Sequence, residues 1–273
     1  MKVLLTGASG NFGHEFLDQA DFEVVQLNRD EWVGLGAKLA QGVDVVIHAA
    51  GDLRTRAAAS PVRLFDSNIL STARLLEAMK ECRTPRLIFL SSCAVYGEDM
   101  RTNEESKCSP ASINGIGKLL CEEMIAEFCL EHTIKYEILR IFNMYGGKDR
   151  FSVFSHMKRA LENSVSFALN NKGIAQRDFI HVSDVVRVVL SLLSQNVPYT
   201  HLNIGTGIAT KLSVLIELVG MRFPDLSIRH AQVEEAEYSR ADITRLCGLV
   251  DGDFVCIEDY LVKNFMSDCA GQG

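Results

Sequence analysis

The sequence lacks any concentration of positive charge. Its 28 lysine and arginine residues are outnumbered by 35 acidic residues, which leaves a formal net charge of −7 at pH 7. No basic cluster forms a face for a phosphate backbone, and this argues against a nucleic-acid partner. The sequence also lacks an apolar stretch of the roughly 18 residues that span a bilayer and the N-terminal pattern of a signal peptide. We therefore expect a soluble, cytoplasmic protein that binds neither nucleic acid nor membrane.

Cysteine is present, but the patterns that give it a chemical role are missing. The eight cysteines include no C-x-x-C pair and no spacing typical of metal ligands. We therefore expect buried, reduced thiols and no metal site. The sequence also lacks an internal repeat and a low-complexity linker, so a second lobe would be built from insertions on one sheet and not from a tethered domain.

The alternation of short apolar runs with helical patterns predicts the fold class. The chain has 273 residues, of which 47% are hydrophobic, and this suits one large α/β domain with or without a smaller lobe. Strands alternating with helices predict a doubly wound parallel sheet covered on both faces. The expected strands are 3–5, 23–27, 43–48, 86–90 and 136–142, and the expected helices are 12–19, 64–82 and 112–131.

The pattern loosens after residue 143. Helices are expected at 151–163, 184–193, 212–222 and 257–265, with a short strand at 201–204. We predict a dinucleotide-binding Rossmann domain formed by residues 1–142 and 178–205. A smaller C-terminal substrate-binding lobe would comprise residues 143–177 and 206–273, with a disordered tail from residue 268.

A glycine-rich loop between the first strand and the first helix predicts dinucleotide binding. Gly7, Gly10 and Gly13 stand in a G-x-x-G-x-x-G arrangement. Gly7 permits a tight turn, Gly10 lets the backbone approach a pyrophosphate, and Gly13 allows the helix to pack closely on the strand. The N-terminus of the helix offers free N–H groups and a partial positive charge to phosphates.

The end of the second strand bears on the choice of cofactor. NAD-binding sites usually carry an acidic residue there, which accepts hydrogen bonds from the ribose hydroxyls. This sequence has Asn28 at that place, and Arg29 follows it. A guanidinium pairs well with a 2′-phosphate, so we predict NADP as the cofactor, with NAD as the alternative.

Six segments in this order resemble the extended short-chain dehydrogenase/reductase family, which includes nucleotide-sugar epimerases, dehydratases and 4-ketoreductases. Together they are spread over nearly the whole chain. They are residues 7–13 (GASGNFG), 48–51 (HAAG), 90–97 (LSSCAVYG), 140–146 (RIFNMYG), 177–185 (RDFIHVSDV) and 202–207 (LNIGTG).

The resemblance implies a catalytic Ser or Thr followed by Tyr-x-x-x-Lys on a helix. Ser92 matches the Ser position and Lys118 matches the Lys, but Asn114 stands where the family has its Tyr. In the family the Tyr phenol exchanges a proton with the sugar oxygen, and the Lys holds the nicotinamide ribose and lowers the pKa of the Tyr. An amide has no proton to exchange near neutral pH, so the predicted catalytic residues are Ser92, Asn114 and Lys118, with a non-standard proton donor.

Three interpretations of the missing Tyr stay open. The protein is an enzyme in which another group relays the proton, a binder that does not turn over, or a variant in which Asn114 was introduced to trap a complex. The candidate relays are Lys118, Tyr96, Tyr145, Cys93, His181 and a water held by Ser92 and Asn114.

The resemblance also assigns binding roles. It implies substrate contacts for Ser92, Tyr96, Asn143 and Arg177. The predicted cofactor-binding residues are Gly7, Ser9, Gly10, Asn11, Phe12, Gly13, Asn28, Arg29, His48, Ala49, Ala50, Gly51, Ser91 and Lys118.

The residues after Ser92 bear on the type of reaction. Family dehydratases carry an acidic pair there, whereas this chain has Cys93 and Ala94, which argues against dehydration. We predict an NAD(P)-dependent nucleotide-sugar 4-ketoreductase or epimerase. The alternative is a catalytically impaired NADP-binding regulatory protein on the same scaffold. By the same resemblance, two long helices, 68–82 and 113–131, would form the four-helix bundle of a homodimer.

Overall fold

The computed structural model describes residues 1–52, 60–98, 102–233 and 236–266, and its centre is a six-stranded sheet. The strand order is β2-β1-β3-β4-β5-β9, and all five neighbouring pairs are parallel. The order reverses between β1 and β3, where ligands bind open α/β sheets outside the carboxyl ends of the strands. The strands are β1 (Lys2–Thr6), β2 (Glu23–Leu27), β3 (Val45–His48), β4 (Arg86–Ser92), β5 (Lys135–Ile141) and β9 (His201–Ile204).

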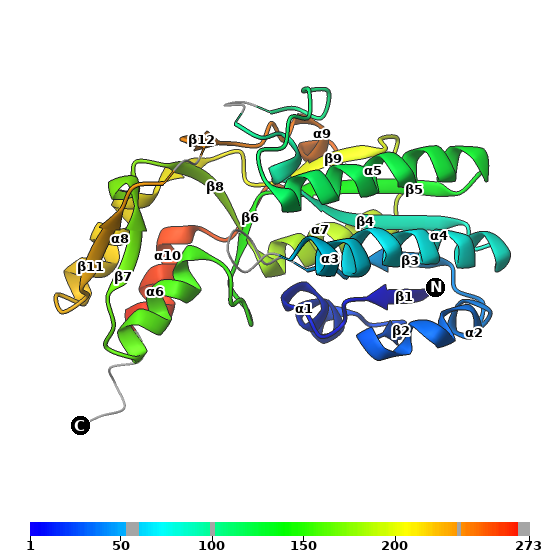
Figure 1. The fold of residues 1–273 in the computed structure, drawn as a ribbon, viewed down its shortest axis with the longest axis horizontal. Helices are drawn as coiled ribbons and strands as arrows, with labels where there is room; N and C mark the ends of the chain where they lie inside the picture. Colours follow the sequence, from blue (N-terminus) through cyan, green and yellow to red (C-terminus); the bar gives the residue numbers. More distant parts are fainter. Residues whose placement is uncertain (53–59, 99–101, 234–235, 267–273) are drawn as a thin grey trace.

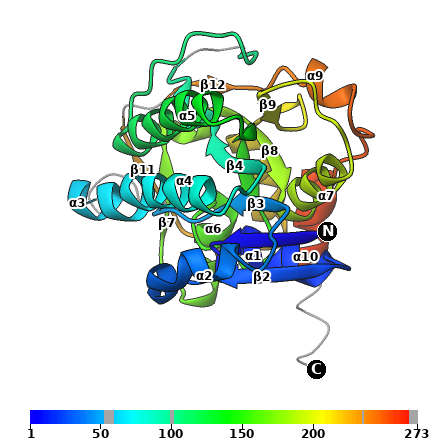
Figure 2. The same ribbon diagram turned by 90° about the vertical axis from the view of Figure 1, so that its right-hand side faces the viewer.

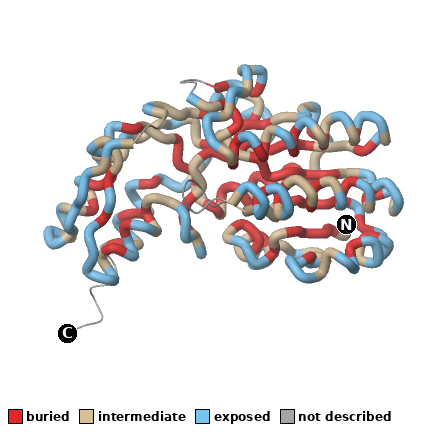
Figure 3. The backbone as a smooth tube through the Cα atoms, viewed as in Figure 1, coloured by how far each residue is buried: buried red, intermediate tan, exposed pale blue. Residues whose placement is uncertain are grey.

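Helices cover both faces of this sheet, which confirms the predicted doubly wound fold (Figures 1 and 2). Strand side chains alternate between two apolar cores. In β1, Val3 and Leu5 face α1 and α7, whereas Leu4 faces α2, α4 and α5. Figure 3 shows the strands as the most buried part of the chain. The helices are α1 (Asn11–Gln19), α2 (Leu35–Leu39), α4 (Ser71–Glu81), α5 (Ile113–Glu131) and α7 (Val182–Leu193).

The helix expected at residues 64–82 is a longer and less regular helical run. It starts as α3 (Pro61–Leu64), continues as a π-helical turn over Phe65–Leu70, and ends as α4. Within the described residues, short 3₁₀ turns occur at Arg29–Gly34, Cys93–Val95 and Asn171–Gly173. A π-helical turn inside a helix is often found at a functional site.

The remaining elements form a second region beside the carboxyl ends of the sheet, at the left of Figure 1. Its core gathers Tyr145, Phe154, Phe179 and Leu215. Two small sheets join β10-β8-β12, with β6 on β8, and β11-β7. The elements are β6 (Asn143–Tyr145), α6 (Val153–Glu162), β7 (Phe167–Asn170), β8 (Gln176–His181), β10 (Ala209–Lys211), α8 (Leu212–Arg222), β11 (Ile228–Ala231), β12 (Tyr238–Ser239) and α10 (Ile257–Met266). The short helix α9 (Thr244–Cys247) lies instead beside β9, where Leu246 joins a core of the six-stranded sheet (Figure 1).

The helices α6, α8 and α10 of this second region were predicted, but its short strands were not. Strands of two to six residues carry too little alternation to be recognised. β8 pairs within the small sheet and not with the six-stranded sheet, although residues 178–181 were assigned to the Rossmann domain. The predicted division into two domains stays a prediction, and the tail from residue 268 lies outside the described residues.

Two expectations about composition can be compared with the fold. Every cysteine in the described part of the chain is a free thiol. Cys121 and Cys129 are buried as expected, but Cys247, at the end of α9, and Cys256, just before α10, are exposed, so the prediction of burial was wrong for them. No helix in the described ranges is long and apolar enough to cross a membrane.

Candidate active site

The glycine loop is held against the sheet by backbone contacts. Gly7 has a φ of +75°, and a Cβ there would lie 2.8 Å from the backbone of Ala49 and Ala50. A Cβ on Gly13 would lie 2.4 Å from the carbonyl oxygen of Gly7. Gly10 is the N-cap of α1, whose first turn holds no acidic side chain. The loop therefore fits a diphosphate, which needs a close approach of the backbone to free N–H groups.

The other residues predicted for this loop take different positions. Ser9 is exposed and Phe12 is buried. The Asn11 side-chain amide donates to the carbonyl oxygen of Gly146 at 3.0 Å. This contact ties the start of α1 to the segment that leaves β6, so the glycine loop also anchors the entrance to the second region.

The end of β2 carries a carboxylate that the sequence argument overlooked. The backbone N–H of Asn28 donates to Glu31 at 2.7 Å, and Lys38 donates to the same carboxylate at 2.9 Å. Both contacts lower the pKa of Glu31, the Asn28 N–H most. Arg29 is exposed. The Glu31 carboxylate and the Arg29 guanidinium therefore both lie at the end of β2, where a bound cofactor would place its ribose.

His48, the last residue of β3, is hydrogen-bonded to a threonine on each side, and the two bonds run in the same direction. Its Nδ1 lies 2.7 Å from the Thr6 hydroxyl, which accepts from the N–H of Ala50. Its Nε2 lies 2.9 Å from the Thr72 hydroxyl, which donates to a carbonyl oxygen. Since Thr72 already donates, Nε2 is the protonated nitrogen and Nδ1 accepts. Burial, and then Lys118, lower the pKa of His48 to about 3, so the ring is neutral.

The loop after β3 is held by Asn68, which the sequence argument missed. Asn68 lies in the π-helical turn, and its side-chain oxygen accepts from the N–H of Asp52 at 2.6 Å. A Cβ on Gly51 would lie 3.4 Å from that oxygen and 3.7 Å from the Nζ of Lys118. The only signal in the sequence was a polar residue on the inner face of an apolar helix.

The predicted catalytic residues gather where β4 ends and α5 begins. Ser92 is the last residue of β4, and its hydroxyl accepts from the N–H of Ala94 at 3.2 Å. Helix α5 packs closely here, because a Cβ on Gly115 would lie 2.4 Å from the carbonyl oxygen of Ala94. Asn114 and Lys118 lie one turn apart on this helix. The structure therefore brings the expected Ser, Asn and Lys to the carboxyl end of β4.

Lys118 is buried, with 4% of its surface exposed. Its Nζ donates to the carbonyl oxygen of Leu90 at 2.7 Å and lies 4.5 Å from the ring centre of Phe89. Burial lowers the pKa of Lys118, against the opposing effects of Cys121 and Glu122. Within the described ranges it makes no ion pair.

Asn114 is 8% exposed, and its Oδ1 is buried without a hydrogen-bond partner in the described part of the chain. Such an atom is costly, because it has lost its water and gained nothing in return. An unpaired acceptor beside Lys118 therefore marks a place where a hydrogen-bond donor is missing.

A buried polar network lies behind these residues. Arg140 donates twice to Glu122, at 2.7 and 3.1 Å, and Ser91 donates to the same carboxylate. Arg140 also donates to the Tyr96 hydroxyl at 3.1 Å, and Tyr96 donates to Asn203 at 2.6 Å. The structure thus places Ser91 and Tyr96, expected at the cofactor and the substrate, with their hydroxyls in this network. Sequence reasoning missed Glu122 and Arg140, although both are charges within apolar elements.

Two of the expected proton relays make their contacts in the second region, and a third is a weak acid. Tyr145 is fully buried and donates to a backbone carbonyl in the core of the second region. The ring of His181 packs against the rings of Tyr145 and Tyr260, and its Nδ1 accepts from the N–H of Ser183. Burial raises the pKa of the Cys93 thiol to about 11, with Ser239 acting in the opposite direction.

The expected substrate residues Asn143 and Arg177 lie at the junction of the two regions. Asn143 donates to the carbonyl oxygen of Asp178 at 2.8 Å, and Arg177 donates to the carbonyl oxygens of Gln176 and Ala236. The buried Asp178 carboxylate accepts three backbone N–H groups, those of Thr206, Gly207 and Ala241. Asp178 therefore fixes the position of both residues.

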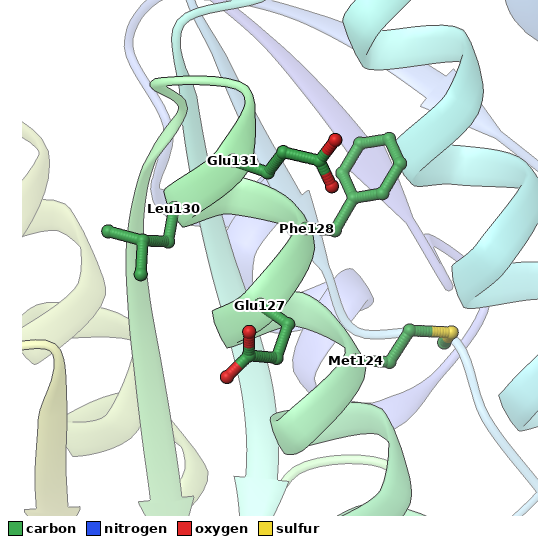
Figure 4. Close-up of a pocket in the computed structure, with 5 residues that line it drawn as sticks. All are labelled: Met124, Glu127, Phe128, Leu130 and Glu131. Atoms are coloured by element: carbon green, nitrogen blue, oxygen red, sulfur yellow. The ribbon is translucent and has the colours of Figure 1, made fainter.

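The surface hollows lie away from this crevice. One of about 490 Å³ is formed by the last two turns of α5, at the opposite end of the helix from Asn114, and its lining is Met124, Glu127, Phe128, Leu130 and Glu131 (Figure 4). A second, of about 560 Å³, lies between α6 and β7. Neither is lined by a predicted catalytic or cofactor residue.

Comparison with known proteins shows what this arrangement belongs to. The model of the NAD dependent epimerase/dehydratase family matches residues 3–205. The chain belongs to that family. A putative UDP-glucose 4-epimerase of Methanocaldococcus jannaschii is 32% identical over 80% of this chain and 81% of its own. The GDP-6-deoxy-D-mannose reductase of Pseudomonas aeruginosa is 28% identical over 64% of this chain and 62% of its own.

Two solved structures have the same fold as this chain. MoeE5, in complex with UDP-glucuronic acid and NAD, superposes with a TM-score of 0.86 at 23% identity, over 97% of this chain and 98% of its own. TunA, an NAD-dependent NDP-hexosamine 5,6-dehydratase, superposes with a TM-score of 0.88 at 22% identity, over 97% and 96% of the two chains. The α/β fold of this family member is therefore that of nucleotide-sugar enzymes.

Proposed function

We propose that this family member is an NAD(P)-dependent oxidoreductase that acts on a ring hydroxyl of a nucleotide sugar, as an epimerase or a 4-ketoreductase. The proposal depends on the arrangement of Ser92, Asn114 and Lys118 at the end of β4 and the start of α5. It depends also on the glycine loop, whose glycines lie too close to neighbouring backbone for a side chain. The names of the curated relatives, an epimerase and a reductase, support it.

Different residues of the chain would bind the cofactor and the sugar substrate. The glycine loop and the N-terminus of α1 would hold the diphosphate of the dinucleotide, whose nicotinamide ring supplies the hydride chemistry when bound. Ser92 would hydrogen-bond the reacting sugar oxygen, since its hydroxyl is already oriented by Ala94. Asn143 and Arg177 would meet the nucleotide part of the substrate at the junction of the two regions.

Dehydration is not favoured. A 4,6-dehydration needs an acid to protonate a leaving hydroxyl. Cys93 and Ala94 occupy the places after Ser92, and the raised pKa of the Cys93 thiol, about 11, makes it a weak acid. The chemistry left to the site is oxidation and reduction at one carbon.

A product assay tests the proposal. The purified protein is incubated with UDP-, dTDP- and GDP-hexoses and their 4-keto-6-deoxy forms, with each nicotinamide cofactor, and the sugars are separated and identified. An epimerase forms the C4 epimer without net use of cofactor, whereas a ketoreductase oxidises one reduced cofactor per product. Cofactor binding without any product would contradict the proposal and favour a regulatory binding protein.

We further propose that the cofactor is NADPH, because Arg29 is exposed beside Asn28 at the end of β2. Calorimetric titration should give several-fold tighter binding of NADPH than of NADH, and Arg29→Ala should abolish the difference while Arg74→Ala, on exposed α4 surface, leaves it unchanged. Glu31 opposes this prediction, because its carboxylate can repel a 2′-phosphate. Equal affinities or a preference for NADH would show that Glu31 dominates.

We propose a homodimer formed through α3 and α5. These elements pack together, with a Cβ on Gly117 lying only 2.6 Å from Leu64. The exposed apolar side chains are Val62 (69%) on α3, Phe65 (52%) in the π-helical turn that follows it, and Ile116 (54%) and Leu120 (48%) on α5. Side chains of this kind are stabilised when a second copy covers them. Light scattering should show a dimer at micromolar concentration and a monomer for Leu120→Glu, with Leu130→Glu near the far end of α5 as the control. A monomeric parent protein would contradict the proposal.

A further inference from the structure

The proposed chemistry needs a side chain that exchanges a proton with the sugar hydroxyl, and the structure leaves few candidates. The hydroxyls of Tyr96 and Tyr145 are buried and bonded within the protein. Nδ1 of His181 accepts from the N–H of Ser183 in α7, and its ring packs against Tyr145 and Tyr260 in the second region, whereas Ser92 and Asn114 lie at the end of β4 and the start of α5. Of the expected relays in the described ranges, only the Lys118 amine, the Cys93 thiol and a water on Asn114 are left. A thiol with a pKa of about 11 exchanges protons poorly at neutral pH.

Lys118 and Asn114 have hydrogen-bonding capacity that the protein does not use. The only hydrogen bond described for Lys118 runs from Nζ to the carbonyl oxygen of Leu90. A neutral amine in this position keeps a free lone pair after that bond is made. Asn114 is more than nine-tenths buried, and its Oδ1 has no partner in the part of the chain that the structure describes. The two side chains lie one turn apart on α5, above the end of β4.

The charges around Lys118 oppose only in part the lowering of its pKa by burial. Glu122 follows it by one turn, but this carboxylate is neutralised by Arg140 and bonded by Ser91. From the sheet, His48 is neutral. Asp52, in the loop beyond Gly51, has Arg63 at 3.9 Å. Cys121, on the same helix, has a pKa raised by burial and stays a neutral thiol.

Resting on the proposed function, we propose that Lys118 Nζ is itself the group that exchanges the proton with the substrate hydroxyl, and that Asn114 Oδ1 accepts the hydrogen bond that orients this hydroxyl. In the oxidation direction the O–H bond breaks and its proton goes to the Nζ lone pair. The hydride on the same carbon goes to the oxidised nicotinamide, and a C=O bond forms. In the reduction direction the Lys118 ammonium returns the proton to the oxygen. Asn114 thus serves as a binding residue where a phenol would have served as an acid.

An isosteric substitution tests this assignment. Asn114→Asp keeps the shape and places a carboxylate one turn from Lys118, which should raise the pKa of Lys118 by about one unit or more. The pKa is measured without cofactor, by NMR of protein labelled at the lysine side chains, with the Lys118 signal assigned by its absence in Lys118→Arg. Asn103→Asp is the matched control, because the exposed Asn103 already uses its side-chain oxygen as an acceptor.

The same variants are compared in the product assay across pH. In the parent protein the limb of the pH–rate profile should coincide with the pKa measured for Lys118, below that of an ordinary lysine. Asn114→Asp should move both to higher pH together, and Asn103→Asp should move neither. Lys118→Arg, which stays protonated, should lose about 10²-fold or more in rate.

The outcomes separate the two proposals. If the parent protein forms product but its pH limb does not follow the pKa of Lys118, another group exchanges the proton and this inference is wrong while the function stands. A rise in turnover for Asn114→Tyr would also overturn it, because it would show a pocket that had merely lost its phenol. If no nucleotide sugar gives product, the proposed function fails first, and the role of Lys118 fails with it.

Discussion

At the glycine loop the crevice is built from backbone, whereas at the start of α5 it is built from side chains. Around Gly7 and Gly13 the nearest atoms are backbone carbons, nitrogens and oxygens, at distances that leave no room for a Cβ. Around Lys118 the neighbours are an aromatic ring, a buried carboxylate network and an unpaired amide. Where backbone atoms leave no room for a Cβ, almost no substitution is accommodated. Where side chains form the site, an amide such as that of Asn114 can take the place of a phenol without a change in the backbone. The difference teaches that binding and chemistry can vary separately in this fold.

The largest expected effect comes from the buried side chains around α5. Glu122→Ala removes the partner of Arg140 and leaves a buried, unpaired guanidinium, so it should lower the free energy of unfolding by about 3–5 kcal/mol. The matched control is Glu123→Ala, the exposed neighbour on the same helix. Urea unfolding measures both. Equal losses for the two variants would mean that the network does not hold α5 on the sheet and that the comparison is wrong.

A smaller effect is expected from the backbone end. Gly13→Ala should destabilise the fold by about 1–3 kcal/mol and weaken dinucleotide binding, because its Cβ would lie 2.4 Å from the Gly7 oxygen. Gly36→Ala, in α2, is the control, since nothing lies within 4 Å of its Cβ position. Alanine is the better helix former by up to about 1 kcal/mol, so this control should be stabilised. Unfolding and calorimetric titration check both, and a Gly13→Ala variant as stable as the control would refute the close approach.

The smallest effect is expected for His48, at the end of β3 between the glycine loop and the start of α5. The pKa of His48 is lowered to about 3 in the fold, so between that value and its ordinary value of 6.5 only the unfolded chain takes up the proton. Stability should therefore fall as pH falls through this window, by up to about 1.4 kcal/mol per pH unit. His48→Gln should flatten the difference in unfolding free energy between about pH 7 and about pH 5. An equal pH dependence in both proteins would place its cause in the other histidines.

Much of the Rossmann half could be predicted because its signals are local. Each strand of the large sheet is a short apolar run, and parallel strands buried on both faces need no other pattern. The glycines of residues 7–13 are demanded by contacts within the same turn, apart from the contact of Gly7 with β3. The short strands β10 and β12 gave no such signal, because their partner β8 lies far away in the sequence.

The candidate site was predicted in part. The resemblance placed Ser92 and Lys118, and the structure brings them together. It could not show that the Tyr96 hydroxyl is bonded to Arg140 and Asn203, which come from two other strands. Nor could it show that Glu31 lies against Asn28, since a capping contact depends on a turn that propensity alone does not specify.

The sequence by itself determined the family, the doubly wound sheet, the glycine loop and the absence of a tyrosine at residue 114, because each of these depends on residues that are neighbours in the chain. Only the tertiary structure decided what surrounds Lys118 and Asn114. Burial is the physical reason. Glu122 is neutralised by an arginine from β5, His48 is kept neutral by its burial and by Lys118, and the Asn114 oxygen has no partner in the described part of the chain. Which groups carry charge or spare hydrogen bonds depends on elements far apart in the chain, and these meet only when it folds.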